Sequence, residues 1–190
     1  MAVSKTAAAK ASAPPAAGSL GELIEEFRTL EHGRRQRGLV QEESERYYSL
    51  FARLDEALAS GERKRRADQR QFLRVPTELV LVLRTPTGPV EVACADFGGG
   101  GCFFHGPLDV KSGDTLWLDG ARLKGETHPL HGRALVAWVD SGEGKQRGQG
   151  VRFVLESDAF RDQIDRLFYR ILAAVLGDVT AKPSSGKVAH

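Results

Sequence analysis

The chain contains Arg63-Lys64-Arg65-Arg66-Ala67-Asp68-Gln69-Arg70-Gln71-Phe72-Leu73-Arg74, and further along Asp96-Phe97-Gly98-Gly99-Gly100-Gly101. The first stretch crowds cationic side chains together, and the second offers one carboxylate followed by glycines. Guanidinium groups bind phosphates in a bidentate manner and stack on flat bases. A carboxylate accepts hydrogen bonds from a base edge such as that of guanine, and glycines let a ligand approach the backbone closely. The two stretches therefore indicate a site for an anionic ligand with a flat hydrogen-bonding part.

Short apolar runs separated by turn residues surround the glycines. The runs that we predict to be strands cover residues 79–83, 90–95, 102–105, 115–118, 130–139 and 150–155. Turn signals such as Thr85-Pro86-Thr87-Gly88 separate them, and no helical pattern intervenes. This arrangement is typical of an antiparallel barrel. A small barrel leaves little room inside, so we expect the ligand on its outer face, at the mouth where the basic stretch enters.

The two stretches, in this order, resemble the signature of the PilZ domain, a bacterial receptor module for cyclic di-GMP. That signature is Arg-x-x-x-Arg followed by Asp/Asn-x-Ser-x-x-Gly. Arg70-Gln71-Phe72-Leu73-Arg74 matches its first half. Asp96 and Gly101 match its second half, but Gly98 stands where the family has serine. The resemblance extends from about residue 63 to residue 176 and includes Gly148-Gln149-Gly150-Val151-Arg152-Phe153.

The resemblance implies an α+β fold, namely a six-stranded antiparallel β-barrel with a C-terminal helix, here preceded by an N-terminal helical hairpin. It also implies roles for individual residues. Arg70 and Arg74 would hold the phosphates and stack on guanine, and Asp96 would take the base edge. Gly101 would allow the turn, and Arg66 would add a further phosphate contact.

The glycine at position 98 removes one hydroxyl from the implied site. One lost hydrogen bond costs about 0.5–1.5 kcal/mol, or about 1.5–3 kcal/mol if it met a charged group. Loss of a bidentate or stacking arginine costs about 1–3 kcal/mol, and Arg70 and Arg74 both remain. We therefore expect a weakened receptor. Gly98→Ser should tighten binding by restoring a contact at little steric cost, provided that Gly98 does not have a positive φ. The alternative is a degenerate PilZ-like scaffold that does not bind the nucleotide and acts through protein contacts.

The remaining sequence predicts five regions. Residues 1–18 lack large apolar side chains and are expected to form a disordered tail. Residues 19–60 are expected to form a helical hairpin. Its first helix begins at a capping box, Ser19-Leu20-Gly21-Glu22, and ends at His32-Gly33. A polar link over 34–38 leads to a second helix over about 42–59. Residues 61–74 form a basic linker. Residues 75–177 form the barrel and a helix that begins at Asp158 and stops at Gly177, and residues 178–190 form a second disordered tail.

The apolar stripes of the predicted helices are too wide to remain uncovered. We expect the hairpin to contact the barrel domain or a second chain, which leaves a homodimer open. We also expect it to be the output element, through which an unidentified protein partner is contacted.

Composition and motifs exclude several other classes. A net charge of +2 does not supply the broad basic face of a protein that binds nucleic-acid polymers. No apolar run is long enough to enter a membrane, so a cytoplasmic protein is expected. Cys94 and Cys102 are interpreted as buried thiols in a reducing compartment. His128 and His131 have no cluster of Cys or carboxylates beside them, so we expect no metal and no cofactor. No Ser/His/Asp or Cys/His constellation can be assembled, so we expect no enzymatic activity.

Overall fold

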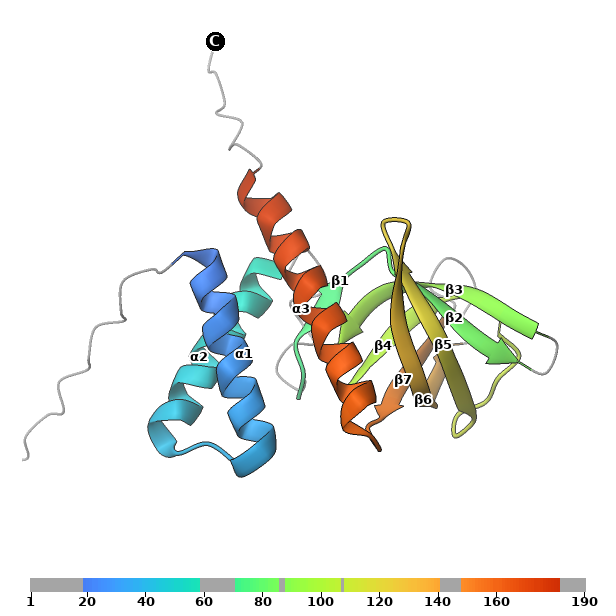
Figure 1. The fold of residues 1–190 in the computed structure, drawn as a ribbon, viewed down its shortest axis with the longest axis horizontal. Helices are drawn as coiled ribbons and strands as arrows, with labels where there is room; N and C mark the ends of the chain where they lie inside the picture. The colour runs from blue at the N-terminus through green and yellow to red at the C-terminus, as the bar shows by residue number, and fades with distance from the viewer. Residues whose placement is uncertain (1–18, 59–70, 86–87, 107, 141–147, 182–190) are drawn as a thin grey trace, which may run out of the picture.

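The computed structural model describes residues 19–58, 71–85, 88–106, 108–140 and 148–181 (Figure 1). Its elements are α1 (Leu20–Arg37), α2 (Gln41–Leu58), β1 (Arg74–Pro76), β2 (Val80–Thr85), β3 (Gly88–Gly98), β4 (Gly101–His105), β5 (Thr115–Leu123), β6 (Glu126–Asp140), β7 (Gly148–Val154) and α3 (Asp158–Ala181). The predicted ligand residues Arg66 and Arg70 lie outside the described residues, as does the tail predicted for residues 1–18.

Strands β2 to β7 form a closed antiparallel barrel. They follow the order β3-β2-β5-β6-β7-β4, and β4 pairs back onto β3. The first part of β3 pairs with β2, and its last residues, 96–98, pair with the short strand β1. Strand β1 therefore extends one end of the barrel. The predicted six-stranded barrel is confirmed.

The barrel interior is filled by the inward-facing side chains of alternating strand positions. Leu81 and Leu83 of β2 are buried, for example, whereas the residues between and beside them are more exposed. Cys94 and Cys102 are buried free thiols, as predicted. The core therefore follows the two-residue periodicity of the apolar runs.

Helix α1 begins at the predicted capping box. The Ser19 hydroxyl accepts a hydrogen bond from the backbone N–H of Glu22, whose carboxylate accepts one from the N–H of Ser19. The predicted end at His32-Gly33 is wrong, and so is the polar link over 34–38. The helix continues to Arg37 and ends at Gly38, whose φ is 75°.

The last turns of α1 are held by ion pairs at helical spacing. Arg34 and Arg35 donate to the carboxylate of Glu31 at distances of 2.8 to 3.0 Å. Pairs three and four residues apart stabilise a helix, and Glu31 is also buried. These contacts outweigh the local tendency of Gly33 to end the helix.

The helical hairpin packs against α3, which stands between the hairpin and the barrel (Figure 1). The buried apolar side chains of this region are Ile24, Phe27, Tyr47, Leu50, Leu54, Leu58, Phe160, Ile164, Leu167, Phe168, Ile171, Leu172 and Leu176. Helix α2 also contacts β1. The prediction that the hairpin contacts the barrel domain is confirmed, and these stripes bury one another within a single chain. A homodimer stays a prediction.

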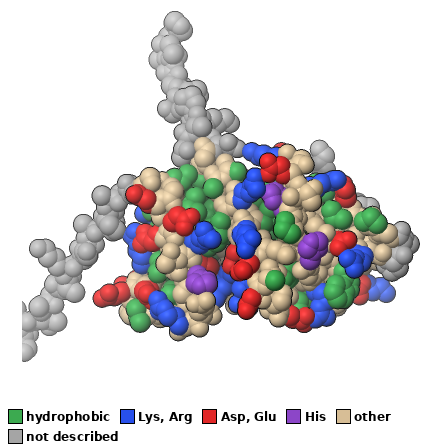
Figure 2. All heavy atoms as spheres, in the orientation of Figure 1, with side chains coloured by type: hydrophobic (Ala, Val, Ile, Leu, Met, Phe, Trp, Pro, Cys, Tyr) green, Lys and Arg blue, Asp and Glu red, His purple; other side chains and the backbone are tan. Residues whose placement is uncertain are grey.

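Helix α3 continues past the predicted stop at Gly177 to Ala181, so part of the predicted C-terminal tail is helical. A single glycine inside a helix costs only about 1 kcal/mol relative to alanine, which a packed helix tolerates. Among the described helices, none has the length and apolar character needed to cross a membrane. Acidic and basic side chains are interleaved on the face of the molecule drawn in Figure 2.

Candidate functional site

Four consecutive glycines join β3 to β4 in a tight hairpin. Gly98 pairs with Gly101, and Gly99 and Gly100 form the tip. None of the four has a positive φ. Backbone conformation therefore does not explain why glycine occupies these positions.

Close approach of neighbouring groups does explain it. A Cβ atom at Gly98 would lie 2.6 Å from the carbonyl oxygen of Leu73, and one at Gly101 would overlap the carbonyl oxygen of Val151 in β7. The reason for glycine at position 101 thus differs from the predicted one, because contact with β7 and not the turn itself excludes a side chain. The condition attached to Gly98→Ser is met, since its φ is not positive. The expectation that serine fits at little steric cost is wrong, because Leu73 fills the space.

Gly98 and Gly101 form a flat glycine floor, and cross-strand register places one arginine on either side of it. Arg74 of β1 is paired with Gly98, Gly98 with Gly101, and Gly101 with Arg152 of β7. Residues directly paired across strands point to the same face of a sheet. With strands about 4.8 Å apart, the Cα atoms of Arg74 and Arg152 lie within about 14 Å of each other. Arg152 is exposed and forms no ion pair with any residue that the structure describes.

A groove of about 330 Å³ opens over this row of residues. Its lining consists of Gln71, Phe72, Arg74, Gly98, Gly100, Gly101, Ala137, Trp138, Gly150, Val151 and Arg152. Trp138 forms one aromatic wall. The residue is 44% exposed. Its ring stacks on Phe103 with centroids 5.2 Å apart and covers Gly150 so closely that a Cβ there would overlap the indole. An exposed indole that stacks on Phe103 and lines the same groove as two arginines can stack on the planar part of a ligand whose charge the arginines neutralise.

Asp96 lies beside the groove without lining it. Its carboxylate accepts a hydrogen bond of 3.0 Å from the guanidinium of Arg74, and its side chain is 18% exposed. The pair fixes the direction of Arg74. Of the predicted site residues, the structure brings together Arg74, Gly98 and Gly101 in the groove, with Asp96 behind Arg74.

Sequence reasoning missed Arg152, Trp138 and Phe72 as groove residues. Arg152 stands between the buried Val151 and Phe153. That alternation alone predicts that its side chain points outward. Its register with Gly101 is not visible in the sequence. Trp138 lies beside an irregularity in the β6–β7 pairing, so its position was equally hidden.

The helical hairpin reaches the glycine turn through Arg35. A Cβ at Gly99 would lie 2.8 Å from a guanidinium nitrogen of Arg35, which also donates to Glu31 and to Asp165 of α3. Burial by itself raises the pKa of Glu31, but hydrogen bonds from Arg34 and Tyr47 and the charge of Arg35 outweigh it and hold that pKa below its ordinary value. Glu31 is therefore ionised, and its carboxylate accepts hydrogen bonds from both arginines in the last turns of α1.

The family model of the PilZ domain matches residues 68–170, more than half of the 190-residue chain. Solved structures similar to this chain include the PilZ domain of YcgR from Escherichia coli with c-di-GMP, at 12% identity and TM-score 0.45, covering 60% of this chain and 99% of that one. The PilZ domain of CeSA from a cellulose synthesizing bacterium has 16% identity and TM-score 0.40, covering 52% of this chain and 97% of that one.

The Bacillus subtilis inhibitor of motility (MotI/DgrA) has 17% identity and TM-score 0.43. The match covers 54% of this chain and 50% of that one, so the chain spans about half the length of that protein. No curated protein is significantly similar to the chain.

Proposed function

Because the chain belongs to the PilZ domain family, we propose that it binds cyclic di-GMP in the groove beside the glycine turn and relays this binding to a protein partner. One observation carries the proposal. The row Arg74, Gly98, Gly101, Arg152 crosses four neighbouring strands and lines one groove. Cyclic di-GMP carries two phosphates on a compact ring, and an arginine at each end of a flat glycine floor suits them.

The proposed role of each residue follows from its place. Arg74 and Arg152 bind phosphate oxygens, and the glycines let the ligand lie close to the backbone. Trp138 stacks on a guanine, and Asp96 orients Arg74 or accepts from a base edge. From the family signature we add Arg66 and Arg70 as further phosphate contacts. This is a binding protein and not an enzyme in our proposal, with no cofactor besides the ligand and no metal.

The downstream role is the finer part of the proposal. The family resemblance favours control of bacterial motility or surface behaviour. The helical hairpin is the surface offered to a protein partner because it touches the glycine turn through Arg35. We place the protein in the cytoplasm, where the messenger is made and degraded.

A second function has one observation in its favour. Gly98 replaces the family's serine, and the carbonyl of Leu73 leaves no room for a side chain there. A site that has lost this hydroxyl is what a PilZ-like scaffold acting only through protein contacts would contain. The titration below separates the two functions.

Calorimetric titration of the full chain with cyclic di-GMP tests the proposal. We expect saturable binding with a Kd between high nanomolar and about 50 µM. Arg152→Ala and Arg74→Lys should each weaken binding roughly 5- to 150-fold, because each removes a contact worth about 1–3 kcal/mol. Arg84→Ala is the matched control, since Arg84 is an exposed strand arginine paired with Asp119 away from the groove. Absence of saturation at about 100 µM ligand would reject the receptor and favour the scaffold.

A further inference from the structure

Phe72 covers the tip of the glycine turn. A Cβ at Gly100 would lie 2.5 Å from the Phe72 ring, and one at Gly99 would lie 3.7 Å from it. Phe72 and Gly100 also both line the groove. The ring therefore occupies surface that a ligand lying on the glycine floor would use.

The same ring is attached to the helical hairpin. The guanidinium carbon of Arg34 lies 5.6 Å from the centre of the Phe72 ring and 5.3 Å from that of Tyr47 in α2. Arg34 is itself held by two hydrogen bonds to the buried Glu31. Cation–π contacts of this kind contribute most when they are partly desolvated, as here. Phe72 thus links the glycine turn to both helices of the hairpin.

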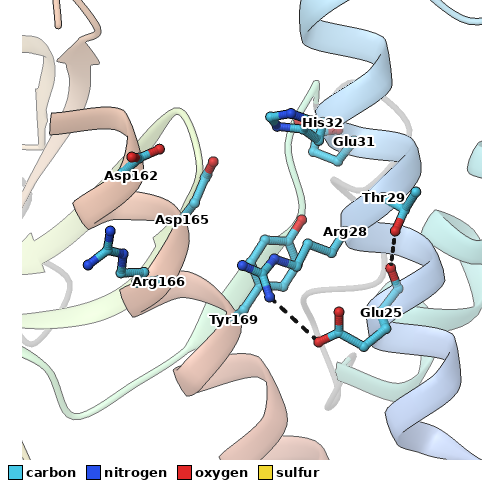
Figure 3. A pocket seen from close by; sticks show the side chains of 9 residues that line it. All are labelled: Glu25, Arg28, Thr29, Glu31, His32, Asp162, Asp165, Arg166 and Tyr169. Carbon is cyan, nitrogen blue, oxygen red and sulfur yellow. Dashed lines mark hydrogen bonds and ion pairs between the residues drawn. The ribbon is translucent and has the colours of Figure 1, made fainter. Parts of the chain in front are cut away.

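Helix α1 is attached to α3 by polar side chains as well as by its buried apolar ones. The side chain of Arg35 bonds to Asp165 at 2.8 and 2.9 Å, and Arg28 lies over the ring of Tyr169 at 5.5 Å. Between these contacts the two helices are separated by a polar cavity of about 500 Å³, into which Arg28 and Tyr169 point (Figure 3). The cavity therefore interrupts the packing of α1 on α3 at this end of the interface.

We propose that Phe72 is a latch, which holds the hairpin against the glycine turn when the groove is empty and is displaced when the groove is filled. The proposal rests on the proposed function for the identity of the ligand. Displacing the ring from Gly100 breaks its contact with Arg34, so the helical hairpin loses one of its contacts with the glycine turn. Because coupling between two equilibria is reciprocal, loosening the latch by mutation must also raise the affinity for the ligand.

The ligand-free half of the test uses hydrogen exchange of the α1 amides in the full chain. Phe72→Ala should raise exchange roughly two- to thirty-fold, the range of a lost cation–π contact. Gly100→Ala should act in the same direction, because its new Cβ displaces a rotatable ring and no backbone. Combining the two should add little. Trp117→Ala is the matched control, since Trp117 also contacts an arginine, Arg133, at 5.6 Å, but on the barrel surface. Unchanged α1 exchange in both latch variants would overturn the proposal.

The second half adds saturating cyclic di-GMP. The wild-type chain should then exchange its α1 amides as fast as ligand-free Phe72→Ala, and that variant should show no further rise. Arg34→Ala, which changes no group lining the groove, should bind the ligand roughly two- to thirty-fold more tightly. Binding of ligand without any change in α1 exchange would overturn the latch and leave the receptor standing. Absence of binding would overturn the receptor and the release step, whereas the ligand-free comparison would still decide whether Phe72 holds the hairpin.

Discussion

Two hairpin turns in this barrel use glycine for different physical reasons. At the β5–β6 turn, Lys124 and Gly125 have φ angles of 50° and 85°, and a Cβ at Gly125 would meet no atom within 4 Å. At the β3–β4 turn, no glycine has a positive φ, yet each of the four would bring a Cβ within 3 Å of another group. Glycine serves conformation in the first turn and space in the second. The turn that must leave space is the one beside which β1, the helical hairpin and the groove meet.

The largest expected effect is at Gly101. Gly101→Ala forces a Cβ into the backbone carbonyl of Val151, and neither β4 nor β7 can move without opening the barrel wall. We expect a loss of about 3 kcal/mol in the free energy of unfolding, at the upper end for overpacking. That corresponds to a fall in Tm of roughly 6–12 °C, measurable by circular dichroism. A variant that melts within about 2 °C of the wild type would contradict the space explanation.

A smaller effect is expected at Gly98. Gly98→Ser places its Cβ 2.6 Å from the carbonyl of Leu73, but β1 is a strand of three residues that can shift. We expect a loss of about 1–2 kcal/mol in stability. Ligand affinity should fall about tenfold, because Arg74 moves with β1 out of its register with Gly98. This reverses the expectation from the sequence, in which the added hydroxyl tightens binding.

Gly98→Ala separates the two effects of serine. It adds the same Cβ without the hydroxyl. Equal affinities of the alanine and serine variants in calorimetry would assign the whole loss to the displaced strand. A serine variant that binds more tightly than the wild type would show that β1 accommodates the side chain, and the interpretation of Gly98 would be wrong.

These two glycines also show what sequence could supply. The signature spacing and the apolar runs were sufficient to predict the barrel and to group Arg74, Gly98 and Gly101. The neighbours that exclude a side chain, Leu73 and Val151, belong to other strands. Their positions depend on cross-strand register. Irregularities in pairing, such as the one between Val136 and Trp138, shift that register locally.

The same limit applies to Arg152 and to the end of α1. Arg152 joins the site only through its pairing with Gly101. Helix α1 outlasts Gly33 because Glu31 is buried where Arg34 and Arg35 can reach it, which depends on packing against α3. Local patterns predict the elements, and tertiary contacts decide their ends and neighbours.

The smallest expected effect is at Gly125, where the backbone conformation that the new residue tolerates matters more than its size. Gly125→Ala should cost about 1 kcal/mol, since an L-residue is strained at positive φ, and should lower Tm by roughly 2–4 °C. Gly125→Asn should be nearly neutral, because asparagine tolerates this conformation and no neighbour obstructs its side chain. At Gly101, asparagine should be no better than alanine, because any Cβ meets Val151. Neither Gly125 variant should change ligand affinity, since this turn does not line the groove. If Gly125→Asn were as costly as Gly125→Ala in thermal unfolding, space would matter at both turns and the distinction between them would fail.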